Sequence, residues 1–130
     1  MNANNSKREH LSRLRQEVAR SVQEMQELLR ALLHPRSMMV GSFYEMYKKC
    51  GRTSCPCTKG KLHGPFPVLS VSRAGHRSTR SVPRKRAGEI RKRAEAYRDF
   101  MRDLRRLRKC MKQLVELLVA IRDASTESGL

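Results

Sequence analysis

Apolar residues recur with helical spacing at both ends of the chain and lose that spacing in the middle. In residues 7–34 they return every three or four positions, with charged residues between them. Residues 86–123 repeat this period over a longer stretch. Pro35 ends the first stretch, because a proline biases the residue before it away from helix. The pattern predicts two long helices, over 7–34 and 86–123. Their apolar stripes comprise Leu11, Leu14, Val18, Val22, Met25, Leu28, Leu29, Leu32 and Leu33 in the first, and Ile90, Ala94, Tyr97, Met101, Leu104, Leu107, Met111, Leu114, Leu118 and Ile121 in the second.

The sequence pattern of residues 37–83 is typical of short strands. FPVLSVS and HRSTRSV alternate on either side of Arg73-Ala74-Gly75, which is typical of a β-hairpin with glycine at the turn. MMVGSFYEMYKK predicts a strand before them. The predicted fold class is therefore α+β: two long helices, as an antiparallel hairpin or coiled coil, flanking a small β-hairpin and zinc-knuckle module. Residues 1–6 and 124–130 are expected to be disordered tails.

The two apolar stripes are too long to cover each other. At 1.5 Å per residue the second helix would be about 55 Å long. Leu11, Val18, Met25 and Leu32 share one heptad position, which favours a coiled-coil seam. We therefore expect a homodimer in which two helical hairpins form a four-helix bundle.

Four side chains suited to metal binding lie within residues 48–65. Cys50, Cys55, Cys57 and His63 follow the spacing C-x4-C-x-C-x5-H and offer the sulfur and imidazole donors of tetrahedral zinc. This spacing matches none of the common zinc-finger spacings. The alternatives are free thiols in a basic loop, or a redox pair of Cys55 with Cys57. The predicted cofactor is Zn²⁺. Cys110, on the second helix, is interpreted as a core or surface thiol.

Positive charge dominates the composition. The chain has 29 Lys and Arg against 12 Asp and Glu, for a net charge of +17, which favours a polyanionic partner, and nucleic acid first. DNA is favoured over RNA. Residues 41–85 hold ten Lys and Arg and one acid, Glu45. Arginines interleaved with hydroxyl residues suit phosphate contacts, although an ordinary solvated hairpin is the alternative. The candidate nucleic-acid-binding residues are Lys48, Lys49, Arg52, Lys59, Lys61, Arg73, Arg77, Arg80, Arg84, Lys85, Arg91 and Arg93.

Targeting signals are not evident in the sequence. No apolar run approaches the roughly 20 residues of a membrane span, and MNANNSKREH lacks the apolar core of a secretory signal. We therefore expect a cytoplasmic protein with no membrane partner. A reducing cytoplasm favours metal binding over disulfides.

Residues 41–83 resemble a family of short bacterial proteins and domains of unknown function. The shared pattern is roughly G-[ST]-x-Y-x-x-[YR]-[KR]-[KR]-C-G-[KR]-x-x-C-x-C, followed by H-G-P-aromatic, a strand, a turn and a basic strand. Phe66-Pro67-Val68 departs from it, since the family tends to show aromatic residues there. The resemblance implies association with mobile elements, phage-like recombination loci or defence systems. We separately expect a larger partner, such as a recombinase, transposase, nuclease or CRISPR-type nucleoprotein. The matching residues are Tyr44, Lys48, Lys49, Cys50, Gly51, Arg52, Cys55, Cys57, His63, Gly64 and Pro65.

Catalysis is not expected. Glu45 is the one acid in residues 37–85, so that region has no carboxylate pair for general acid–base chemistry. One ion would use all four ligands and leave no open position for water. The favoured function is a homodimeric, zinc-containing accessory protein that binds nucleic acid. The alternatives are a protein adaptor, whose helical bundle docks a larger nucleic-acid enzyme, and a thiol redox switch that releases zinc on oxidation.

Overall fold

The chain divides into a helical unit and a sheet unit. The computed structural model describes residues 2–129, so Met1 and Leu130, which fall in the two expected tails, lie outside the described residues. The helical unit contains Met1–His34 and Met101–Leu130, and the sheet unit is Pro35–Phe100. The α+β class is confirmed, with two long helices and a three-stranded antiparallel sheet.

Helix α1 spans Ala3–Leu33. Its N-cap is Asn2, whose side-chain oxygen accepts a hydrogen bond of 3.3 Å from the backbone N–H of Asn4. This cap satisfies a free N–H of the first turn, and it corrects the expected disordered lead-in, because residues 3–6 are helical. The helix ends before His34 and Pro35, as predicted from the proline.

Helix α2 spans Ala87–Ala124 and follows a short 3₁₀ turn at Arg84–Arg86. Its bounds differ from the expected 86–123 by one residue at each end. The first part of α2 belongs to the sheet unit and the part from Met101 to the helical unit. Residues 125–129 form neither helix nor strand. Within residues 2–129, neither helix contains a stretch apolar enough to cross a bilayer.

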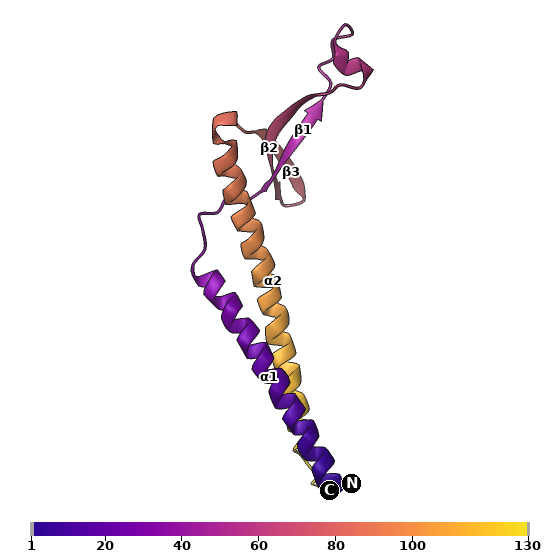
Figure 1. Ribbon diagram of the computed structural model, residues 1–130, viewed down its shortest axis with the longest axis vertical. Coiled ribbons are helices and arrows are strands. Elements are labelled where there is room, and N and C mark those ends of the chain that lie inside the picture. The colour runs from indigo at the N-terminus through magenta and orange to yellow at the C-terminus, as the bar shows by residue number, and fades with distance from the viewer. Residues whose placement is uncertain (1, 130) are drawn as a thin grey trace. The chain divides into compact units, whose positions relative to one another are not determined.

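In the helical unit, α1 and the second part of α2 lie side by side and antiparallel (Figure 1). The buried and half-buried positions in each helix recur in alternating steps of three and four, yet Leu14, Ser21 and Cys110 are the fully buried ones among the described residues of this unit. The remaining seam positions are only half-buried, so the pair has little core of its own. These seam positions are Leu11, Leu14, Val18, Ser21, Met25, Leu28 and Leu32 in α1, and Asp103, Leu107, Cys110, Leu114, Leu117, Ile121 and Ala124 in α2.

The stripe predicted for α2 is partly wrong. Met111 and Leu118 are each 50% exposed, whereas Cys110 and Leu117 occupy the less exposed positions. Both stripes keep a seven-residue repeat and share Leu107, Leu114 and Ile121. The face toward α1 otherwise runs through Asp103, Cys110 and Leu117, one residue before the predicted Leu104, Met111 and Leu118. Cys110 is thus a core thiol, and burial raises its pKa.

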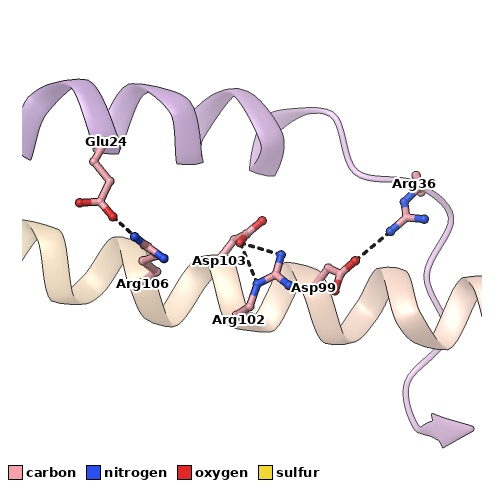
Figure 2. Close-up of polar contacts among 6 residues, drawn as sticks. All are labelled: Glu24, Arg36, Asp99, Arg102, Asp103 and Arg106. Atoms are coloured by element: carbon pink, nitrogen blue, oxygen red, sulfur yellow. Dashed lines mark hydrogen bonds and ion pairs between the residues drawn. The ribbon is translucent and has the colours of Figure 1, made fainter.

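Two polar contacts set the pairing of the helices. The Ser21 hydroxyl donates to the backbone oxygen of Cys110 at 3.5 Å. Arg106 Nε donates to Glu24 Oε1 at 2.6 Å, the contact that Figure 2 shows. The hydrogen bond from Arg106 lowers the pKa of Glu24. Residue 21 of α1 therefore lies level with residue 110 of α2, and residue 24 with residue 106.

The sheet has the order β1-β2-β3, with β1 at Ser42–Lys48, β2 at His63–Arg73 and β3 at His76–Ser81. Arg73 pairs with His76, so the β2–β3 turn consists of Ala74 and Gly75. Both have positive φ, 49° and 80°, as a two-residue hairpin turn of type I′ requires. The predicted hairpin is confirmed. The strand before it is confirmed over Ser42–Lys48, whereas residues 38–41 of the predicted stretch lie outside it.

The core of the sheet unit is shared between β2 and the start of α2. Successive side chains of a strand point to opposite faces, so Val68 and Ser70, 3% and 4% exposed, mark the buried face of β2. The backbone N–H of Met39 donates to the oxygen of Arg93 at 3.0 Å and holds the entering chain against α2. The other buried residues of this core are Val82, Ile90, Ala94 and Ala96.

Ser70→Ala should stabilise the sheet unit. The hydroxyl of Ser70 is buried and has no hydrogen-bond partner, so its desolvation is uncompensated. Removing it is expected to raise the free energy of unfolding by about 1 kcal/mol, measured by urea titration of the metal-loaded protein. Ser72→Ala is the control, since Ser72 lies on the same strand face but is exposed. A destabilised Ser70→Ala variant would show that the hydroxyl is satisfied after all.

Candidate functional site

The candidate metal centre lies in the loop between β1 and β2, beyond the paired ends of these strands (Figure 1). Lys48 pairs with His63, so Cys50 and His63 leave the sheet close together. Gly64 permits this approach: its φ is 141°, and a Cβ there would lie 2.8 Å from the backbone oxygen of Met46. A side chain at this position would push the two strands apart.

Local backbone hydrogen bonds fold the loop back on itself. Cys55 precedes a 3₁₀ turn at Pro56–Lys59, and the Thr58 hydroxyl donates to the Cys55 backbone oxygen at 2.8 Å. Gly60, in the left-handed region with φ 105°, ends the turn. The chain thereby reverses between Cys57 and His63.

These elements bring all four predicted ligands together. The three Sγ atoms and a ring nitrogen of His63 lie within 4.8 Å of one another. Cys50 Sγ is 3.5 Å from Cys57 Sγ, and Cys55 Sγ is 3.1 Å from His63 Nε2. In a tetrahedral zinc site such donors would be separated by roughly 3.6–3.8 Å, given Zn–S near 2.3 Å and Zn–N near 2.0–2.1 Å. Cys50, Cys55, Cys57 and His63 could therefore hold a metal ion.

Backbone N–H groups surround the sulfur atoms. A hydrogen bond from the backbone of Arg52 and another with the Cys57 thiol lower the pKa of Cys50 to about 6. The backbone of Cys57 lowers the pKa of Cys55, but hydrogen bonding with Cys50 and burial outweigh it, so that pKa is raised. The N–H of Cys50 also donates to Cys57 Sγ at 3.5 Å. Such N–H···S contacts orient thiolates toward a shared ion, a feature that the sequence pattern did not reveal.

Burial differs among the four ligands. Cys57 is 1% exposed, Cys55 is half-buried, and Cys50 and His63 are exposed. The group is thus anchored at Cys57 and open to solvent on the side of Cys50 and His63.

The basic candidates on the loop and hairpin are exposed. Lys48 Nζ lies 5.0 Å and the Arg84 guanidinium 5.9 Å from the centre of the Phe66 ring, within cation–π range. The remaining ones form no ion pair in the part of the chain that the structure describes. These are Lys49, Arg52, Lys59, Lys61, Arg73, Arg77, Arg80 and Lys85.

The hairpin divides its arginines between two faces. Arg77 pairs with Ser72 and shares the face of Ser70, whereas Arg80 pairs with Leu69 on the opposite face. Arg73 lies on the same face as Arg80, beside a groove of about 340 Å³. The sequence interpretation grouped Arg77 with Arg80. Because successive side chains of a strand point to opposite faces, residues three positions apart, such as Arg77 and Arg80, lie on different faces. The groove is lined by Leu69, Val71, Arg73, His76, Ser78 and Arg80.

Two of the arginines predicted to bind nucleic acid already form ion pairs within the sheet unit. Arg91 donates to Glu45 at 2.9 Å and lies over the Phe43 ring at 4.8 Å. Arg93 Nη1 lies 3.8 Å from Glu89 Oε1, within ion-pair distance. Glu45, the one acid of residues 41–85, thus neutralises an arginine of α2, a pairing across 46 residues that charge counting could not anticipate.

Comparison with protein-family models gives a match over most of the chain. Residues 9–92 match the family model described as Domain of unknown function (DUF6788). The match spans more than half of the chain and includes the sheet and the four metal-ligand candidates. No curated protein and no solved structure is significantly similar to the chain. The expected relation to a family of short domains of unknown function is confirmed, while the association with mobile elements stays a prediction.

Proposed function

We propose that this chain, which belongs to the DUF6788 family, is a zinc-containing accessory protein that binds nucleic acid through its sheet unit and pairs with a second copy through its helical unit. Zinc is the ion that best suits the donors, since three sulfurs and one imidazole form a typical structural zinc set. With four protein ligands the ion has no open position for substrate. The role of the metal is therefore to fold the loop, and the protein acts without catalysis of its own.

The observation that carries nucleic-acid binding is the imbalance of charge in the sheet unit. Pro35–Phe100 contains sixteen Lys and Arg against four acids. Three of these acids, Glu45, Glu89 and Asp99, already pair with arginines of the same unit (Figure 2 shows Asp99 with Arg36). The basic residues of the loop and hairpin are left without counter-charges from the described residues. A polyanion supplies them, and releases its own counterions on binding.

Binding to duplex DNA should fall steeply with salt. Contact with about six phosphates gives a slope of log K on log salt near −5, or about a thousandfold loss of affinity between 50 and 200 mM salt. Fluorescence anisotropy with a labelled duplex at several salt concentrations measures the slope. A wild-type protein that does not bind DNA or RNA at 50 mM salt would refute the proposed function.

Position matters as much as charge in this proposal. Arg73→Gln with Arg80→Gln should weaken binding to all sequences by similar factors, because phosphate contacts carry no sequence information. Lys112→Gln with Arg122→Gln removes equal charge from the helical unit, and a much smaller loss is expected. Equal losses in both pairs would mean that basicity alone attracts the nucleic acid.

The helical unit supports self-association. In α1 the exposed aliphatic residues Val22, Leu29 and Leu33 share one face, since they are seven and four positions apart. In α2 the exposed residues Met111, Val115, Leu118 and Val119 form a second stripe. Exposed apolar faces of this extent are normally covered by a partner. Further helices packed against the pair would also bury more of the half-buried side chains between α1 and α2.

A second copy suits these stripes because they lie at different levels of the hairpin. Residue 21 is level with residue 110, so the α1 stripe lies on one side of this level and the α2 stripe on the other. A two-fold axis near this level places the α1 stripe of one protomer against the α2 stripe of its partner, as an isologous interface requires.

A further inference from the structure

One face of the β2–β3 hairpin combines positive charge with an apolar floor. Leu69 and Val71 of β2 are half-buried and form the floor of the groove. Around them, the exposed side chains of Arg73, His76 and Arg80 come from the ends of the two paired strands. The groove of about 340 Å³ is thus open, basic at both ends and apolar in the middle.

Arg73 and Arg80 lie well apart along the direction of the strands. Arg73 pairs with His76, and Arg80 lies four residues further along β3. At about 3.3 Å per residue, the two backbones are separated by roughly 13 Å. Ser78 lies midway between them and pairs with Val71, so its hydroxyl stands over the apolar floor. Neither arginine pairs with an acid within the described residues.

We infer that this groove holds the sugar–phosphate backbone of one nucleic-acid strand. Arg73 and Arg80 bind phosphates at its two ends, the Ser78 hydroxyl donates to a phosphate oxygen between them, and the sugar carbons contact Leu69 and Val71. This inference rests on the proposed function and assigns it to one face of the hairpin. Among the described residues, no Phe, Tyr or Trp lines the groove, which favours contact with phosphate and sugar over stacking with bases.

An acidic polypeptide is the competing occupant, since carboxylates also pair with arginine. Regular spacing favours nucleic acid, because every nucleotide repeats a charge followed by a sugar with apolar carbons. This is the alternation of charge and apolar surface that the groove offers.

The test compares single substitutions on neighbouring residues of β3. Arg80→Gln removes a groove arginine, and Arg77→Gln removes an exposed arginine from the opposite face. At 0.1 M salt, Arg80→Gln should weaken binding to labelled DNA about eightfold and reduce the salt slope by about 0.9, since one fewer counterion is released. Arg77→Gln should change affinity less than twofold. Arg73→Gln combined with Arg80→Gln should reduce the slope by about 1.8.

The results distinguish failure of the groove assignment from failure of nucleic-acid binding itself. If the wild type binds with a steep salt slope but Arg77→Gln and Arg80→Gln lose affinity equally, the protein binds nucleic acid and the groove assignment is overturned. If poly-glutamate competes as well as a DNA strand of equal charge, and Arg80→Gln weakens both, the groove is a general site for acidic chains and the sugar–phosphate assignment is again overturned. Absence of wild-type binding removes the proposed function itself. Circular dichroism of each variant checks that it is folded.

Discussion

Removing the metal should unfold the loop between β1 and β2 and leave the helical unit folded. Of the residues between these strands, Cys57 is the one that is fully buried, so packing contributes little to the stability of this loop. Structural zinc binding contributes on the order of 10 kcal/mol to folding in small zinc domains. Without the ion, the three thiols and the imidazole within 4.8 Å of one another are joined only by weak contacts of thiol groups, such as that of Cys55 Sγ with His63 Nε2. We therefore expect the loop to lose its order on treatment with a strong chelator.

Cys55→Ser tests this expectation and Cys110→Ser is its matched control. The first substitution removes one of the four donors, and the second removes a thiol that is buried in the helical unit and lies outside the donor group. Elemental analysis should find about one zinc per chain in the wild type and Cys110→Ser, and far less in Cys55→Ser. Amide hydrogen exchange should show lost protection in residues 49–62 of Cys55→Ser, with protection of α1 unchanged. Wild-type protein that contains no metal when purified without chelator would contradict the zinc assignment.

A charge on the exposed stripe of α2 should separate the dimer into monomers. Leu118 is 50% exposed and Val115 59%, so Leu118→Glu with Val115→Glu disturbs little within one protomer. In the proposed dimer both positions are buried, and an unpaired buried charge costs several kcal/mol. A dimer with micromolar affinity would then dissociate at any practical concentration, since each 1.4 kcal/mol is a factor of about ten.

Analytical ultracentrifugation over a range of concentrations provides the measurement. The wild type and Gln113→Glu, which places a charge at an exposed position of α2 outside the stripe, should both sediment as dimers. The double variant should sediment as a folded monomer, with helical content checked by circular dichroism. A wild type that is monomeric at every concentration would rule out the second copy, and the same stripes would then favour a different protein as the partner.

The sequence predicted the features that depend on local pattern. Period-two alternation on either side of Arg73-Ala74-Gly75 predicted the hairpin, because glycine readily adopts the positive φ that its turn requires, 80° at Gly75. The four metal-ligand candidates were found from their chemistry alone, since three cysteines and a histidine in fourteen residues have few other uses. The loop geometry that joins them could not be derived, because it depends on Lys48 pairing with His63 across the sheet.

The sequence was less informative where the outcome depends on a distant partner. Whether Cys110 or Met111 faces α1 is decided by the register of the two helices, which Ser21 and Glu24 help to set. Strand alternation predicts that Arg77 and Arg80 lie on opposite faces of β3. It does not predict which of these faces is the buried one, marked by Val68 and Ser70. The pairing of Arg91 with Glu45 is a tertiary contact that no local pattern encodes.

The outer edge of β3 limits how the sheet can grow. In the order β1-β2-β3 this strand has a neighbour on one side only, so its other side presents free backbone donors and acceptors. In an antiparallel pairing of two copies along that side, Arg77 lies opposite Arg77 in one register and Arg80 lies opposite Arg80 in another. The resulting like-charge repulsion discourages fibre-like stacking of sheets. Pairing of two copies through the edge of β3 is thereby disfavoured, even though all six residues of this strand are accessible.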